Sequence, residues 1–93
     1  MDFEWDAAKD LSNFVKHGVR FNEALDCFSD PQGFVLEDVR HSKLEQRFYW
    51  VGKDVFGRIL TVRFTHRAGI IRIIGAAEWR EFRKKYYEKA GDQ

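Results

Sequence analysis

Two apolar runs in the centre of the chain, between residues 57 and 75, are separated by a short polar break. In the first run, residues 58–67, apolar and polar side chains alternate, which predicts a half-buried β-strand. The second run, residues 70–74, is rich in isoleucine and contains one charge, Arg72. Because the break contains Gly69, the pattern predicts a β-hairpin at the centre of a sheet.

The length of the hairpin loop decides where the arginines of these strands lie. Arg63 and Arg67 share one face of the first strand, because strand side chains alternate between the two faces. Arg72 lies on the same face if the loop has two or four residues, and on the opposite face if it has three. Three arginines on one face of a central sheet need either solvent or an anionic partner, and the sequence leaves both open.

Helical periodicity marks the N-terminal part of the chain. The first predicted helix covers residues 6–17, with Asp6 as its N-cap and Gly18 as its C-terminal stop. We expect this helix to pack on the sheet through an apolar stripe at helical spacing. A second, short helix is predicted over residues 22–28, with Asn22 as its cap. The stripe of the first helix consists of Ala8, Leu11, Phe14 and Val15.

Short β-rich runs account for the rest of the sheet. The connections between them are short, which favours a mainly antiparallel arrangement. Together with the helices they predict a single α+β domain over residues 1–93, in which two N-terminal helices pack on a mainly antiparallel sheet of about four strands. A C-terminal helix, with Trp79, Phe82 and Tyr86 on one stripe, completes the domain. The runs lie at residues 3–5, 34–36 and 45–51.

Charge is distributed unevenly along the chain, although the net charge is only +1. Residues 1–57 carry seven basic and eleven acidic side chains, and residues 58–93 carry nine basic and four acidic ones, so the two parts have net charges of −4 and +5. A basic half on a near-neutral protein favours a side that faces an anion. The alternative is a solvated helix with ordinary surface arginines.

Composition also restricts location and chemistry. No apolar stretch approaches the roughly 20 residues of a membrane span, and the N-terminus lacks the regions of a signal peptide. The single cysteine, Cys27, excludes an internal disulfide and a cysteine-based zinc site, and we expect it to be a small buried hydrophobe. His17, His41 and His66 lack metal-ligand spacing. We therefore expect no metal, no cofactor and no membrane, in a cytoplasmic protein.

The arginines point to phosphate chemistry. Cleavage of RNA without a metal needs a base for the ribose 2′-hydroxyl, fixed cations for the phosphate and an acid for the leaving 5′-oxygen. Arginine suits the second role, because its planar fork holds two phosphate oxygens and keeps its charge. His41 and Glu45 are the candidates for acid and base. The candidate cations are Arg63, Arg67 and Arg72, with Arg47 and Lys53 nearby in sequence.

Taken singly, each of these residues also has an ordinary structural explanation. An exposed arginine on a strand usually keeps that face soluble, and Arg47 can pair with Glu45 or Glu37. His41 lies in a polar segment, where a histidine is most often only a surface residue. The candidate site therefore depends on the group as a whole.

The segment WDAAKDLSNFVKHGVRFNEALDCFSDP, which begins at Trp5, contains the specific block Lys16-His17-Gly18. Further matches follow in order and spacing at Asp38, His41, Glu45, Arg47, Gly52, Gly57-Arg58, Arg67 and Arg72-Ile73-Ile74. In these positions, over nearly its whole length, the chain resembles the BrnT toxin family.

This resemblance implies a type II toxin with a RelE-like fold that acts as a metal-free ribonuclease and arrests translation. It also implies a cognate BrnA-like antitoxin, a dimeric DNA-binding protein that neutralises the toxin and carries it to operator DNA. By position, Arg67 and Arg72 are the best matches to the active site, followed by His41, Glu45 and Arg47, with Arg63 as support. The alternative is a non-catalytic nucleic-acid- or antitoxin-binding module on the same fold, a degenerate toxin.

One position departs from the family pattern. Many members read Ile-Ser-Ala-Arg after the last strand, whereas this chain ends the run at Ala77 and lacks the arginine. Some members share the Trp79-Arg80 pair that follows, which is typical of a subgroup. Either Arg80 or Arg83, on the C-terminal helix, supplies the missing cation for RNA, or the activity is weaker or different.

Overall fold

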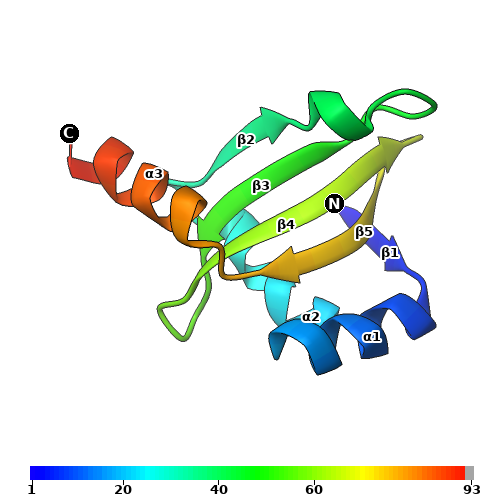
Figure 1. Ribbon diagram of the computed structural model, residues 1–93, viewed down its shortest axis with the longest axis horizontal. Helices are drawn as coiled ribbons and strands as arrows, with labels where there is room; N and C mark the ends of the chain where they lie inside the picture. The colour runs from blue at the N-terminus through cyan, green and yellow to red at the C-terminus, as the bar shows by residue number, and fades with distance from the viewer. Residues whose placement is uncertain (92–93) are drawn as a thin grey trace.

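A five-stranded sheet with the strand order β1-β5-β4-β3-β2 forms the centre of the computed structural model, which describes residues 1–91 (Figure 1). Neighbouring strands are antiparallel except for β1 and β5, which are parallel. All five β-rich runs form strands, the N-terminal one by pairing with β5, so the sheet has one strand more than the approximate four expected. The strands are β1 Asp2–Trp5, β2 Phe34–Glu37, β3 Phe48–Lys53, β4 Ile59–Arg67 and β5 Ile70–Ala77.

Three α-helices and two 3₁₀ turns complete the described part of the chain, residues 1–91, giving the predicted α+β fold. Helices α1 and α2 precede β2, and α3 follows β5 (Figure 1). Within the described residues, no helix is both long and apolar enough to cross a membrane. The helices are α1 Ala7–His17, α2 Phe21–Ala24 and α3 Arg80–Gly91, and the 3₁₀ turns are η1 Leu25–Ser29 and η2 Val39–His41.

The β4–β5 hairpin has a two-residue loop. Ala68 and Gly69 both have positive φ angles, of 49° and 80°, as a tight hairpin turn requires. Arg67 consequently pairs with Ile70, and Thr65 pairs with Arg72. A bulge follows, so that Arg63 stands opposite Gly75. Arg63, Arg67 and Arg72 therefore lie on one face of the sheet, as the two-residue alternative predicts.

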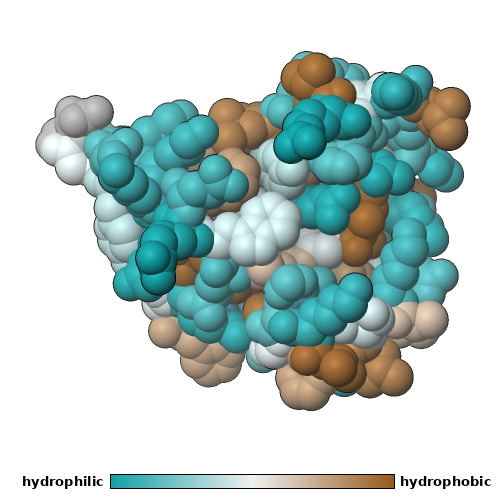
Figure 2. Space-filling view, in the orientation of Figure 1, coloured by the Kyte–Doolittle hydropathy of each residue, from teal (hydrophilic) through white to brown (hydrophobic). Residues whose placement is uncertain are grey.

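The two faces of the sheet are covered to different extents. On one face, side chains of β4 and β5 pack with Phe21, Ala24 and Cys27 from α2 and η1 into the larger core cluster. On the other face, Phe82 and Tyr86 of α3 pack on Val51 and Ile59. Helix α3 thus covers only one end of this second face (Figure 1). The remainder, which carries the three arginines, is largely hydrophilic at the surface (Figure 2).

Helix α1 has the predicted bounds but the opposite orientation. Asp6 caps it by accepting hydrogen bonds from the amides of Ala8 and Lys9, and Gly18 ends it with a φ of 71°. The predicted apolar contact is wrong, because Leu11, Phe14 and Val15 are 57%, 45% and 78% exposed. Helix α1 lies at the lower edge of Figure 1, and Figure 2 shows apolar surface along the same edge.

Asn13, and not the apolar stripe, attaches α1 to the sheet. Strand β1 pairs with β5 only as far as Ile73, which leaves the edge of β5 free beyond that point. There the Asn13 amide nitrogen donates to the carbonyl oxygen of Ala76 at 2.8 Å, and its oxygen accepts the Ala76 amide at 3.1 Å. The same nitrogen also donates to the Val19 carbonyl oxygen at 2.9 Å. The Asn13 side chain thus bonds the backbone groups of Ala76 with which a neighbouring strand would otherwise pair.

The second helix starts earlier than predicted. Its N-cap is Arg20 and not Asn22, since the Arg20 amide donates to the Glu23 carboxylate at 2.9 Å. The buried Asp10 of α1 accepts the Phe21 amide and pairs with the Arg20 guanidinium, which joins the two helices. After Ala24 the chain continues as the 3₁₀ turn η1.

Two further boundaries differ from the prediction, and both affect the candidate site. Strand β3 begins at Phe48, so Glu45 lies in the preceding loop. This loop is closed by the Asp38 amide, which donates to the Arg47 carbonyl oxygen at 2.8 Å. Strand β5 extends to Ala77, and α3 begins only after Trp79.

Candidate functional site

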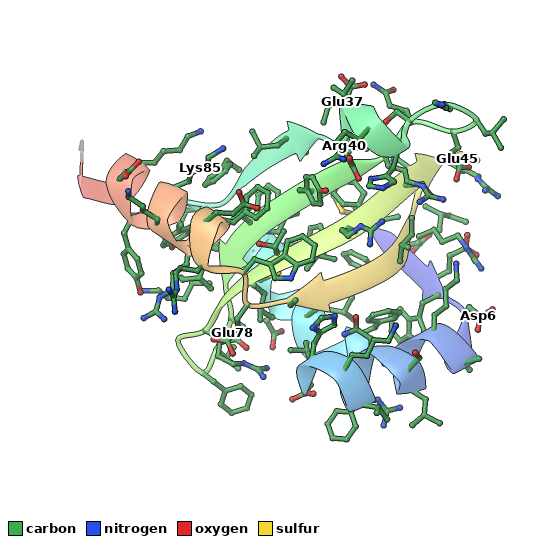
Figure 3. The ribbon with its side chains drawn as sticks, in the orientation of Figure 1. Asp6, Glu37, Arg40, Glu45, Glu78 and Lys85 are labelled. Carbon is green, nitrogen blue, oxygen red and sulfur yellow. The ribbon has the colours of Figure 1, made fainter. Side chains whose placement is uncertain are left out.

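A pocket of about 580 Å³ opens beside the loop between β2 and β3. We call it the loop pocket. Four residues predicted for the site, His41, Glu45, Arg47 and Arg67, meet in its lining. Glu45 and Arg40 lie at the same end of the sheet, far from Glu78 (Figure 3). The complete lining is Arg40, His41, Lys43, Leu44, Glu45, Arg47 and Arg67.

Arg67 and Glu45 form an ion pair with a hydrogen bond from the arginine Nε to the carboxylate. This hydrogen bond, followed by the charges of Arg67, Arg47 and Arg72, lowers the pKa of Glu45 below its usual value. Glu45 is therefore a carboxylate near neutral pH, suited to accept a proton and not to donate one. It also neutralises part of the positive charge of Arg67 in the free protein.

His41 is held by a carboxylate that the sequence reasoning did not assign to the site. Its Nδ1 lies 2.9 and 3.1 Å from the two carboxylate oxygens of Asp38. Asp38 is only 4% exposed, and its own carbonyl oxygen accepts the Ser42 hydroxyl at 2.6 Å. With Nδ1 engaged, Nε2 is the ring nitrogen available to a ligand. The three-residue separation of Asp38 and His41, across one 3₁₀ turn, was the available sequence signal.

Arg72 lies next to the loop pocket without lining it. It pairs with Thr65, two residues before Arg67 on β4, and its guanidinium lies 3.6 Å from the Glu4 carboxylate of β1. Its charge also contributes to the lowered pKa of Glu45. Arg72 and Arg67 therefore present neighbouring cations, each paired with a glutamate.

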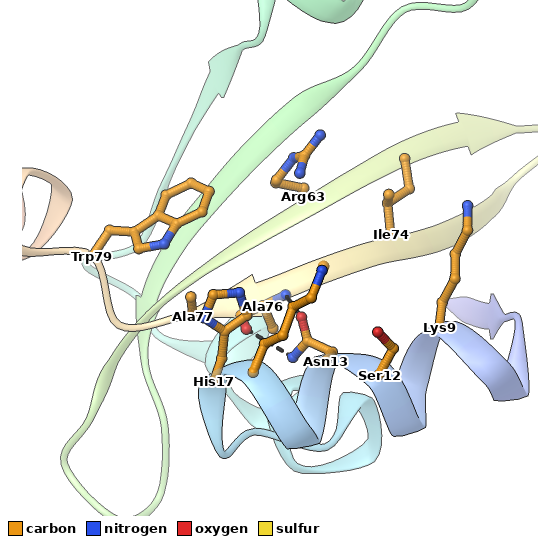
Figure 4. Close-up of a pocket in the computed structure, with 11 residues that line it drawn as sticks. Lys9, Ser12, Asn13, His17, Arg63, Ile74, Ala76, Ala77 and Trp79 are labelled. Carbon is orange, nitrogen blue, oxygen red and sulfur yellow. Dashed lines mark hydrogen bonds between the residues drawn. The ribbon is translucent and has the colours of Figure 1, made fainter.

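Arg63 belongs to a different pocket, of about 260 Å³, between α1 and the end of β5 (Figure 4). We call it the helix pocket. Its basic residues from α1, Lys9, Lys16 and His17, are absent from the predicted site. Two of them lie in the Lys16-His17-Gly18 block, which was the available sequence signal. The complete lining is Lys9, Ser12, Asn13, Lys16, His17, Arg63, Ile74, Gly75, Ala76, Ala77 and Trp79.

The other predicted RNA-binding residues lie outside both pockets. Lys53 ends β3 at the opposite end from the loop pocket, with its ammonium 5.7 Å from the ring centre of Tyr87. Arg80 and Arg83 lie on α3 and are exposed. Ala77 is buried in the wall of the helix pocket.

The thiol of Cys27 has structural surroundings and not those of a reactive group. Cys27 is completely buried, as expected, and burial, with the nearby Asp54 and Asp30 charges, raises the pKa of its thiol to about 12. No group of three His, Cys, Asp or Glu side chains within residues 1–91 is arranged to hold a metal ion.

The fold is similar to that of a ribonuclease toxin. The crystal structure of the Brucella abortus ribonuclease toxin, BrnT, superposes with a TM-score of 0.66 at 21% sequence identity, covering 85% of this chain and 96% of that chain. A comparison with curated proteins finds no match.

The family model described as the ribonuclease toxin, BrnT, of type II toxin–antitoxin systems matches residues 5–82. The chain therefore belongs to the BrnT family of ribonuclease toxins. The matched range contains every residue that lines the two pockets. Membership of a type II toxin–antitoxin family also implies an antitoxin partner.

Proposed function

We propose that this chain is a toxin with a RelE-like fold that cleaves RNA in the loop pocket without a metal ion and thereby inhibits translation. The observation that carries the proposal is the convergence of Arg67, Glu45, His41 and Arg47 on one open pocket. A carboxylate, a histidine and arginines supply the base, the acid and the cations that cleavage needs.

In the proposed reaction, the ribose 2′-oxygen attacks the adjacent phosphorus and the bond to the 5′-oxygen breaks. The Glu45 carboxylate accepts the 2′-hydroxyl proton, and protonated His41 donates a proton from Nε2 to the departing 5′-oxygen. The products are a 2′,3′-cyclic phosphate and a 5′-hydroxyl. Arg67 and Arg72 stabilise the charge that develops on the non-bridging oxygens, with Arg47 at the pocket wall.

Asp38 has a positioning role in this scheme. Its buried carboxylate fixes the His41 ring through Nδ1, so that Nε2 is directed away from it.

The direct test is the double variant Arg67→Ala with Arg72→Ala, compared with wild type after expression in a bacterial host. We expect the variant to lose both growth arrest and RNA cleavage. The matched control is Lys84→Ala with Lys85→Ala, which removes two cations from α3 and should stay toxic. Equal toxicity of wild type and the arginine variant would contradict the proposed site.

Purified protein and a defined RNA test the chemistry. Cleavage that persists in EDTA and yields a 2′,3′-cyclic phosphate is the expected result, whereas loss of cleavage on chelation would refute the metal-free mechanism. Toxicity with intact cellular RNA would refute the nuclease assignment.

We also propose that the antitoxin is BrnA-like, dimeric and DNA-binding, and that the toxin reaches operator DNA only through it. Family membership supports an antitoxin in general. Coexpression of the adjacent reading frame should restore growth, and the purified complex should retard operator DNA while the toxin alone does not.

A non-catalytic binding module is the second candidate. It is favoured by the pairing of Arg67 with Glu45, which neutralises part of the charge of Arg67 in the free protein. This candidate predicts that the protein binds RNA or its antitoxin and releases no cyclic phosphate.

A further inference from the structure

The helix pocket concentrates positive charge without an acidic neighbour in its lining. Lys9, Lys16 and Arg63 carry permanent charges there, and His17 adds a group that can be protonated. No Asp or Glu lines the pocket. This distinguishes it from the loop pocket, where Glu45 pairs with Arg67.

Arg63 supplies a second, independent observation. Its Nε is inaccessible to solvent and has no hydrogen-bond partner, although Arg67 and Arg72 on the same face each pair with a glutamate. A buried N–H without an acceptor is unfavourable. An anion in the helix pocket supplies the negative charge that Arg63 lacks, as the glutamates do for Arg67 and Arg72.

Trp79 gives the pocket an aromatic wall. The side chain is half-buried, packs edge-on against Tyr49 with 6.0 Å between the ring centres, and packs at a tilt against Phe82 with 5.9 Å between the ring centres. These contacts fix the indole beside Arg63, at the end of the sheet face (Figure 4). Fixed aromatic rings beside cations are the combination that binds single-stranded nucleic acid.

We infer that the helix pocket binds a phosphate group of single-stranded RNA and that Trp79 stacks on the adjoining base. The pocket, at about 260 Å³, is slightly smaller than the roughly 300–1,000 Å³ of small-molecule sites, so it admits one group of a longer ligand. That the ligand is RNA rests on the function proposed above. Arg63 and Arg67 are four residues apart on one strand face, roughly 13 Å, so a short RNA can reach both pockets.

The test uses a 2′-O-methylated oligonucleotide, which cannot be cleaved through its 2′-oxygen, and measures its affinity by fluorescence anisotropy at several salt concentrations. For Lys9→Ala with Lys16→Ala, we expect at least tenfold weaker binding. The slope of log affinity against log salt should also be about 0.7 smaller, because the variant loses one phosphate contact and each such contact to a single strand contributes about 0.7. Trp79→Leu should weaken binding about tenfold and leave the slope unchanged.

Two controls separate a local defect from loss of the fold. The variant Lys84→Ala with Lys85→Ala removes the same charge from α3. It should change the affinity and the salt slope less than the Lys9/Lys16 alanine variant does. The double replacement Lys9→Arg with Lys16→Arg should restore wild-type binding.

Inorganic phosphate titrated into wild-type protein should shift the NMR signals of Gly75 and Ala76 and should not do so in the Lys9/Lys16 alanine variant.

The outcomes distinguish this inference from the proposed function. If wild type binds the oligonucleotide through the helix pocket but does not cleave unmodified RNA, the inference stands and the nuclease proposal fails. If the Lys9/Lys16 alanine variant binds like the α3 control, the inference is overturned. It is also overturned if that variant weakens only antitoxin binding, because the pocket would then hold an acidic protein segment.

Discussion

Arg63, Arg67 and Arg72 show how much a residue's surroundings can differ within one short hairpin. The alternation of the strands predicted that they share a face, given a two-residue loop. Their partners could not be predicted, because Glu45 comes from a loop, Glu4 comes from β1, and Arg63 Nε has none. Such contacts join segments that are distant in sequence, and no local pattern records them.

Glu45→Gln tests the residue that holds Arg67. We expect this variant to bind the uncleavable oligonucleotide more tightly than wild type, because it frees Arg67 and removes a negative charge. Cleavage of unmodified RNA should fall about 10²–10⁴-fold, the usual contribution of a general base. Anisotropy and initial rates measure the two effects. Glu88→Gln, on the exposed side of α3, is the control, and weaker binding with unchanged cleavage would contradict both roles of Glu45.

At the scale of elements, the sequence predicted the ends of α1 better than its orientation. Asp6 and Gly18 act within a few residues of themselves, so their capping roles are readable from the chain. The buried side of α1 is set by the free edge of β5, which arises only once β1 has paired as far as Ile73. The apolar periodicity of the helix was therefore a poor guide to its contacts.

Asn13→Ala should destabilise the protein by about 3 kcal/mol, because it leaves the Ala76 amide and two carbonyl oxygens without partners in a buried position. Val15→Ser, on the exposed stripe of the same helix, should change stability by less than about 0.5 kcal/mol. Urea unfolding of the two variants gives both values. Similar losses for the two would mean that the stripe, and not the amide, docks α1.

For the whole molecule, the α+β class, the central hairpin and the basic half of the chain were all predictable. Period-two and helical patterns are local, and the charge difference is visible in the composition. What could not be predicted is that α3 covers only one end of the second sheet face. Because the cover is partial, α3 does not bury the arginines. Its position depends on how the helices pack on the two faces of the sheet.

Asp30 joins distant parts of the molecule at the covered end. It accepts the Tyr86 hydroxyl of α3 at 2.6 Å and the Lys53 amide of β3 at 2.8 Å. Burial would raise the pKa of Asp30, but these hydrogen bonds outweigh it and the pKa lies below its usual value. Burial and the bond to Asp30 raise the pKa of Tyr86 from 10.0 to about 12.

A tyrosine whose pKa is higher in the folded state stabilises the fold below its unfolded pKa, and the contribution disappears as pH rises through the folded pKa. Tyr86 should therefore contribute about 2–3 kcal/mol at neutral pH, lost between about pH 10 and 12. Tyr49, whose pKa burial also raises, acts in the same direction. The contribution is thus measured as the stability difference between wild type and Tyr86→Phe across this pH range. A difference that does not change with pH would contradict it.

The side-chain amide of Asn13 also affects self-association of the protein. An exposed strand edge is a template onto which another chain can add, and natural proteins keep such edges short or blocked. Asn13 occupies the donor and acceptor of Ala76, where β5 runs on past its partner. The two outer strands of the sheet, β1 and β2, are each only four residues long. We expect the Asn13 side chain to hinder the addition of a second molecule to the uncovered end of β5.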